Sequence, residues 1–391
     1  MQRFTERQGF TKRQRGFSLI ELMLALGLGV VVTAGIVQLF VTNDQTYTLL
    51  TGQARMQEGA RFALDFIGRS ARSAGYYGCD PDADKIYGTL NGAPAAPETP
   101  DAWDPVFEFN IRRPIQAFHG INPASGLNDW TPALTTLPRN TGAGVSVNTL
   151  VNGNGVRGVA PGPTNVAGAI RPQTDILVLR HVQVPGARTA DIVSPTANPV
   201  ILDDGSLDFD DDGNDFVVIG NCEQAALFRV TDVQEDTPAA GEATLVRATG
   251  AALFQNAAGR SLSGQSVPYG EANNGQGTAV GRVMSDIYYI GRAATLTNNA
   301  GADVWSLWRK TSEDPPIELV EGVEDLQVLF GIDTTGANDI AAANRYVSFD
   351  QVANNAIRSL RITITATSVD AVDGATPLRR TFSQTIMYRN G

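Results

Sequence analysis

One acidic side chain stands at the start of a long apolar segment of this sequence. Glu21 is followed by the stretch from Leu22 to Thr42, which contains no charged residue. A carboxylate inside a bilayer costs about 3 kcal/mol unless it is paired or reaches water. The position of Glu21 therefore calls for a cationic partner.

A second candidate for chemistry is an acidic tract further along the chain. Alternating carboxylates before a glycine match the first half of a calcium-binding loop. The closing Glu of such a loop is missing, because Ile219 occupies its twelfth position. A solvated acidic turn between two strands would have the same composition. The sequence therefore predicts either that turn or a calcium site with the ligands Asp208, Asp210, Asp212 and Asp215. It predicts no requirement for any other cofactor.

Composition and motifs argue against several classes of function. The chain carries 41 acidic against 30 basic residues and only 2 histidines. Such an acidic protein offers no broad basic surface to DNA or RNA. The sequence also lacks the short motifs of serine hydrolases, zinc proteases, dithiol oxidoreductases and P-loops. It has a G-x-G-x-x-G match at 153–158, but Pro161 and Pro163 exclude the helix that a dinucleotide site requires. We therefore predict a protein that is not an enzyme and has no clear nucleic-acid site.

The apolar segment has the length of a membrane span. At helical rise, the stretch after Glu21 covers roughly 30 Å, enough for one bilayer crossing. The preceding residues 1–16 are basic, so the amino end should stay in the cytoplasm and the rest of the chain should lie outside it. A secretory signal peptide would have a shorter apolar run followed by small residues at a cleavage site. The segment thus predicts a single membrane-spanning helix.

The same helix is predicted to continue beyond the membrane to about Ala74, where Gly75 provides a stop. Asp65 has Arg61 and Arg69 at four-residue distances on one face, the geometry of weak ion pairs. Another face repeats small or apolar residues every three or four positions. This stripe consists of Met56, Ala60, Ala63, Ile67 and Ala71. A buried stripe predicts a stem that packs against a folded head.

The string Gly-Phe-Ser-Leu-Ile-Glu at 16–21 resembles the prepilin leader of type IV pilins and of type II secretion pseudopilins. The resemblance implies cleavage after Gly16 by a prepilin peptidase and N-methylation of Phe17. In that family the acid corresponding to Glu21 pairs with the terminal amine of a neighbouring subunit during assembly, which would satisfy its charge. Residues 1–16 are then a cleavable leader, and residues 17–78 form the transmembrane and stem helix.

The sequence has 2 cysteines, Cys79 and Cys222. Outside the cytoplasm an even number of cysteines is typical of a disulfide. Such a bond would join the end of the stem to a distant strand region and would contribute about 2–4 kcal/mol. Two thiols that never meet are the alternative. The cysteines and histidines are too widely spread to predict a metal site.

Residues 79–391 are predicted to form a β-rich head in the periplasm or outside the cell. Residues 86–172 are rich in Gly, Pro, Ala and Asn, which favours a large loop-rich insertion with one strand-like piece at 106–111. Residues 173–391 form the main β region. A long N-terminal helix packed on an antiparallel sheet is an α+β fold of the type IV pilin-like kind. Strands are predicted at 175–184, 216–220, 226–233, 243–248, 286–291, 303–310, 358–369 and 381–389.

The segment from Ile317 to Asp333 contains the pattern V-x-G-V-x-x-L-x-V. It resembles the carboxy-terminal region of PilW-type minor pilins and, more loosely, of the GspJ pseudopilins. Read from the residues alone, it predicts a strand whose core residues are Val320, Val323, Leu326, Val328 and Phe330.

Together the two resemblances imply a minor pilin that helps to prime assembly of a type IV pilus and stays near its tip, in support of twitching motility, adhesion or DNA uptake. The implied partners are other minor pilins, the major pilin, a tip adhesin and the inner-membrane assembly platform. The protein would span the inner membrane before assembly and lie on the pilus at the cell surface afterwards. The alternatives are a GspJ-like pseudopilin of type II secretion and a membrane-tethered adhesin or binding module.

Overall fold

The computed structural model separates into two units, Met1–Gly52 and Gln53–Gly391. The helix α1 (Leu19–Ser73) belongs to both. The structure describes residues 16–77, 86–93, 109–118, 170–171, 173–183, 188–190, 193, 200–203, 209, 215–220, 224–251, 255–262, 278–311, 316–335, 342–352, 357–371 and 376–388.

Helix α1 is 55 residues long and has no proline, so its hydrogen-bond ladder runs without interruption. It ends at Gly75, whose φ of +76° is costly for a residue with a side chain. The amide of Gly75 donates to the carbonyl of Arg180 at 2.9 Å, which ties the end of the helix to the head. The predicted long helix and its predicted stop are both confirmed.

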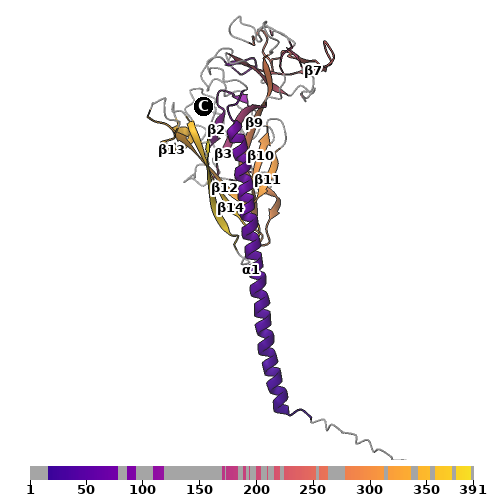
Figure 1. The fold of residues 1–391 in the computed structure, drawn as a ribbon, viewed down its shortest axis with the longest axis vertical. Helices are drawn as coiled ribbons and strands as arrows, with labels where there is room; N and C mark the ends of the chain where they lie inside the picture. Colours follow the sequence, from indigo (N-terminus) through magenta and orange to yellow (C-terminus); the bar gives the residue numbers. More distant parts are fainter. Residues whose placement is uncertain are drawn as a thin grey trace, which may run out of the picture. The chain divides into compact units, whose positions relative to one another are not determined.

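The second half of α1 runs alongside the strands of the head (Figure 1), and it packs on them through the predicted stripe. Ala60, Ala63, Ile67 and Ala71 are fully buried, and Met56 is 6% exposed. The small side chains bring the helix backbone close to the strands, because the distance between packed elements depends on the size of the side chains at the contact. A Cβ added to Gly59 would lie 3.2 Å from a methyl group of Val320. On the opposite, exposed face Asp65 pairs with Arg69 at 2.5 Å.

An eight-stranded sheet forms one part of the head, with the order β1-β6-β5-β9-β10-β11. Its long strand β9 pairs with β3 along one side and with β5 and then β10 along the other, and β3 also pairs with β2. All pairs are antiparallel except β1–β6. The strands are β1 (Ile86–Gly88), β2 (Ile115–Phe118), β3 (Ile176–Gln183), β5 (Phe216–Gly220), β6 (Ala225–Arg229), β9 (Ala279–Thr297), β10 (Asp303–Thr311) and β11 (Ile317–Glu321).

A four-stranded antiparallel sheet has the order β13-β12-β14-β15, and a three-stranded sheet has the order β4-β8-β7. The strands of the first are β12 (Val323–Ile332), β13 (Arg345–Val347), β14 (Ile357–Thr367) and β15 (Arg379–Met387). The strands of the second are β4 (Val200–Leu202), β7 (Asp232–Glu235) and β8 (Ala243–Val246). One core cluster joins the stem to both the eight-stranded and the four-stranded sheet. The predicted α+β architecture is confirmed.

The pattern around Gly322 forms the corner between these two sheets. Gly322 separates β11 from β12 and has a φ of +76°. Its amide donates to the carbonyl of Trp305 at 2.9 Å, and its carbonyl accepts from the amide of Thr367 at 2.7 Å. The predicted core residues Val323, Leu326, Val328 and Phe330 are fully buried, whereas Val320 is only partly buried against the stem.

Three strand predictions need correction. The stretch 226–233 contains β6 and β7, which belong to different sheets, with Val230 between them donating to the carbonyl of Asp215. The described end of 106–111 is a turn rather than a strand. Finally, β9 extends far beyond the predicted 286–291. The predicted loop-rich region 86–172 also supplies two strands, β1 and β2.

Candidate functional site

The amino end of the described chain places its chemical groups at the start of α1. Gly16, Phe17 and Ser18 precede the helix, and the carbonyl of Ser18 accepts the first helical bond, from the amide of Leu22 at 3.0 Å. Glu21 lies in the first turn. A carboxylate there is favoured by the partial positive charge of the helix N-terminus. The same dipole would not neutralise a full charge in a bilayer, so a Glu21 carboxylate placed there would need a cationic partner as well.

The first half of α1 has no apolar partner within its own unit. Every described residue from Gly16 to Leu50 is exposed, including Phe17 at 84% and Phe40 at 69%. Soluble proteins rarely expose so large an apolar surface. The helix is long and apolar enough to cross a membrane. Lipid or neighbouring helices must therefore cover this surface.

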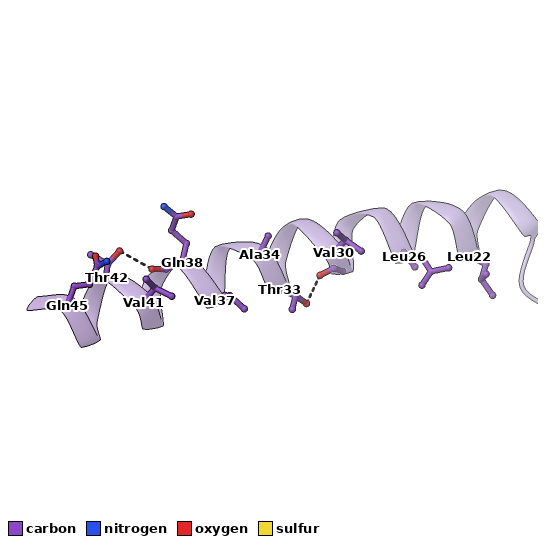
Figure 2. Close-up of a pocket in the computed structure, with 12 residues that line it drawn as sticks. Leu22, Leu26, Val30, Thr33, Ala34, Val37, Gln38, Val41, Thr42 and Gln45 are labelled. Atoms are coloured by element: carbon purple, nitrogen blue, oxygen red, sulfur yellow. Dashed lines mark hydrogen bonds between the residues drawn. The ribbon is translucent and has the colours of Figure 1, made fainter. Parts of the chain in front are cut away.

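The polar side chains of the apolar stretch are those of Thr33, Gln38 and Thr42 (Figure 2). The hydroxyl of Thr33 donates to the carbonyl of Gly29 at 2.7 Å, and that of Thr42 donates to the carbonyl of Gln38 at 2.9 Å. These bonds satisfy the hydroxyls without water. The amide side chain of Gln38 is not satisfied in this way, and in membranes such groups favour contact with another helix. The sequence reasoning did not single out Gln38, although a lone amide in an apolar run was its signal.

A titratable cluster lies where the stem meets the eight-stranded sheet. Ser70 and Tyr288 share a hydrogen bond of 2.8 Å, and burial raises the pKa of Tyr288. Nearby, Arg309 pairs with Asp286 at 3.1 Å. Burial lowers the pKa of His181, and the carboxylate of Asp286 opposes that shift. The cluster joins a stem residue to three strands, so its contacts are those of a structural junction.

The other predicted site residues are only partly described. Asp215 is buried and pairs with Arg282 at 2.8 Å, so this carboxylate already has a cationic partner. The remaining calcium ligands Asp208, Asp210 and Asp212 lie outside the described residues, as do Cys79 and Cys222. Within the described part of the chain, no three His, Cys, Asp or Glu side chains form a group that could hold a metal. Calcium binding and the disulfide stay predictions.

The register of β10 places its two tryptophans on different faces of the sheet. Leu307 lies opposite Ile290 and belongs to the core beneath the stem, with Trp305 packed beside it. Trp308 lies opposite Tyr289 on the other face. The guanidinium of Arg171 lies over the Trp305 ring, 5.2 Å from its centroid, in a cation–π contact.

Comparisons with known proteins match both ends of this architecture. The model of the prokaryotic N-terminal methylation motif matches residues 7–37, which include Gly16, Phe17 and Glu21. The model of the type IV pilus-assembly protein W family matches residues 287–384, from the second half of β9 into β15. No curated protein matches the chain.

The methylation motif and the single apolar helix fit a pilin anchored in the inner membrane. Similarity to a pilus-assembly family implies contact with other components of the pilus. The chain thus resembles a PilW-type pilin of the type IV pilus system at its amino end and over the carboxy-terminal part of its head.

Proposed function

We propose that this protein is a minor pilin that is processed after Gly16 and acts in the complex that primes pilus assembly. The observation that carries the proposal is the coincidence of the methylation motif with an exposed amino end. The bond between Gly16 and Phe17 lies in non-helical, exposed backbone, where a peptidase can bind its substrate. Cleavage there creates a new amine less than two helical turns from Glu21.

The charge pair gives the assembly step its specificity. The apolar surface of α1 can contact any apolar helix, so it does not by itself fix the axial position of a neighbour. A carboxylate and an ammonium group in a low-dielectric environment do fix it, because leaving either one unpaired is costly. Glu21 on this chain would bind the amine of a neighbouring subunit, and its own amine at Phe17 would be free to bind the next acid.

The size of the head supports a position near the tip rather than along the filament. A three-stranded sheet and two further core clusters are added to the sheets that hold the stem. A head of this volume is awkward to repeat at every subunit of a filament. Partners would then be other minor pilins, the major pilin and a tip adhesin, with the periplasmic head of the free protein held at the inner membrane by α1.

Mass spectrometry of amino-terminal peptides from sheared filaments and from host membranes tests this proposal. N-methylated Phe17 in the sheared fraction, in small amount relative to the major pilin, is the expected result. Mature protein in membranes only, together with a secretion defect in a deletion strain, would instead indicate a pseudopilin. An uncleaved amino end in both fractions would refute the proposal.

Two variants separate processing from assembly. A Cβ on Gly16 would meet no atom within 4 Å, so Gly16→Ala should leave the fold unchanged and block cleavage. Glu21→Gln should be cleaved normally and be incorporated into pili at least tenfold less, since the loss of one buried charge partner exceeds 1.4 kcal/mol. Glu58→Gln, an exposed acid further along α1, is the matched control and should be incorporated normally.

A further inference from the structure

Within the part of the chain that the structure describes, strand β15 presents a long sheet edge with no strand beside it. It is the last strand of the order β13-β12-β14-β15 and pairs with β14 alone. With 9 residues it is the longest edge strand that the structure describes, compared with 3 in β13 and 5 in β11. Free edges template the addition of further strands, and proteins usually shorten or disrupt them.

Along β15 the protective charges of an edge strand are confined to its first two residues, Arg379 and Arg380. Its register with β14 has no bulge, and the strand contains neither proline nor lysine. The edge strand β11, by contrast, shifts register against β10. The regular geometry of β15 therefore leaves its outer edge able to pair with another strand along its whole length.

The hydrogen-bond pattern identifies which backbone groups are available. The amide of Tyr388 donates to the carbonyl of Arg358 at 3.0 Å, and the carbonyl of Leu378 accepts from the amide of Ser368. In an antiparallel pair, bonded and non-bonded positions alternate. The even-numbered residues of β15 thus bond to β14. The odd-numbered residues direct their amide and carbonyl groups toward the free edge; they are Arg379, Thr381, Ser383, Thr385 and Met387, and all five side chains are exposed.

The side chains of β15 define the chemistry of a partner. Phe382 and Ile386 lie on the face that meets the stem, and favour apolar residues beside them. On the outer face the hydroxyls of Thr381 and Ser383 bond to hydroxyls of β14, at 3.5 and 3.1 Å, so this face is polar and ordered. Arg380 is exposed, stacks over Phe382 at 5.5 Å and has no acidic partner among the described residues.

We propose that the edge of β15 binds an extended segment of another pilus protein, which adds one strand to the four-stranded sheet. The segment would alternate apolar residues toward the stem face with polar residues outward, and would carry an acid opposite Arg380. Only the origin of the segment in a pilus protein rests on the proposed function. Cleavage at Gly16 and the pairing of Glu21 do not depend on this edge, so the two proposals fail separately.

Photo-crosslinking in piliated host cells tests the proposal. Residues 381, 383 and 385 of the full chain are replaced one at a time by p-benzoyl-phenylalanine. Strand addition predicts that the three attachment points fall on one partner peptide and move by two residues per step, because the side-chain period of a strand is two. Attachment points scattered over several peptides, products within this chain or between two of its copies, or no product at all would overturn it.

A second measurement uses the crosslink at residue 385 as its readout. Ser383→Pro removes one amide from the free edge and none from the bonds to β14, and should lower the yield roughly tenfold. Ser383→Ala removes the hydroxyl only and should leave the yield unchanged. Arg380→Glu reverses the charge of an exposed side chain and should also lower the crosslink yield. Because this change leaves the backbone hydrogen bonds intact, the variant tests the proposal even if the proline variant does not fold. Unchanged yields in the folded variants would refute strand addition.

Discussion

Replacing Gly322 by alanine is expected to destabilise the head more than a glycine substitution ordinarily does. The backbone at Gly322 has a φ of +76°, which costs an alanine about 1–2 kcal/mol. In addition, a Cβ there would lie 2.5 Å from the carbonyl oxygen of Thr367, too close without a backbone shift. Shifts forced by added atoms cost about 1–3 kcal/mol. The expected loss is therefore about 2–5 kcal/mol.

Gly301 offers a matched control for the backbone contribution alone. Its φ is +74°, and a Cβ there would meet no atom within 4 Å. Gly301→Ala should therefore lose only about 1–2 kcal/mol. Urea unfolding of the full chain in detergent, followed by tryptophan fluorescence, measures both variants. Trp305 is a suitable reporter because its carbonyl bonds to Gly322. Equal losses in the two variants would show that the close contact with Thr367 does not exist.

Three further perturbations follow from the described contacts. Asp175→Ala should cost about 1–3 kcal/mol in the same assay, because its carboxylate accepts from the amide of Val328 at 2.8 Å; Asp175→Asn, which keeps an acceptor, should recover most of that loss. Burial lowers the pKa of His181, so the stability due to its neutral form is present above about pH 6.5 and is lost as the pH falls. Between about pH 7 and about pH 5, the free energy of unfolding of the His181→Gln variant should therefore fall less than that of the native chain. An identical dependence of the unfolding free energy on pH in the two proteins would contradict this account. Ile67→Ala should cost about 2–5 kcal/mol, whereas Phe62→Ala, at a side chain that is 51% exposed, should change stability by less than about 0.5 kcal/mol.

The features predicted correctly are those whose causes are local in the sequence. The stripe from Met56 to Ala71 appears because a helix face repeats every three or four residues, whatever it packs against. Strand β14 is recognisable because Leu360, Ile362 and Ile364 alternate with polar residues that face solvent on the other side. In both cases one face is buried and the other is not, which leaves a clear period.

The missed features depend on contacts between distant segments. Strand β9 contains Gly281 and Gly291, which normally interrupt a strand pattern. Gly281 is in fact accommodated because β3 passes so close that a Cβ would lie 2.3 Å from a methyl group of Val182. The break between β6 and β7 likewise arises where Val230 bonds to a residue 15 positions earlier, Asp215. No local pattern carries that information.

The candidate site likewise contains residues whose grouping is local in the sequence and a feature that depends on the tertiary structure. Gly16, Phe17 and Glu21 form a contiguous motif, so their grouping needs no tertiary structure. The role of β15 as a free edge, by contrast, follows only from its place at the end of the sheet order and from the parity of its hydrogen bonds with β14. A strand pattern predicts that β15 exists but not that it has a single neighbour.

The match to the pilus-assembly family has a physical counterpart in the head. Residues 287–384 contain β10, β11, β12, β13 and β14 and parts of β9 and β15, and these strands supply most of the core against which the stem packs. The three-stranded sheet of β4, β7 and β8 lies in a different cluster and outside the match. A stem helix with small residues on its buried face requires strands whose side chains fit it closely, since an added methyl group at Gly59 or Gly68 would already reach a neighbouring side chain. Strands that do not contact the stem are free of this packing constraint. What the family model matches in this head is therefore the surface that holds the stem, and the parts that lie beyond it are where this chain can acquire partners of its own.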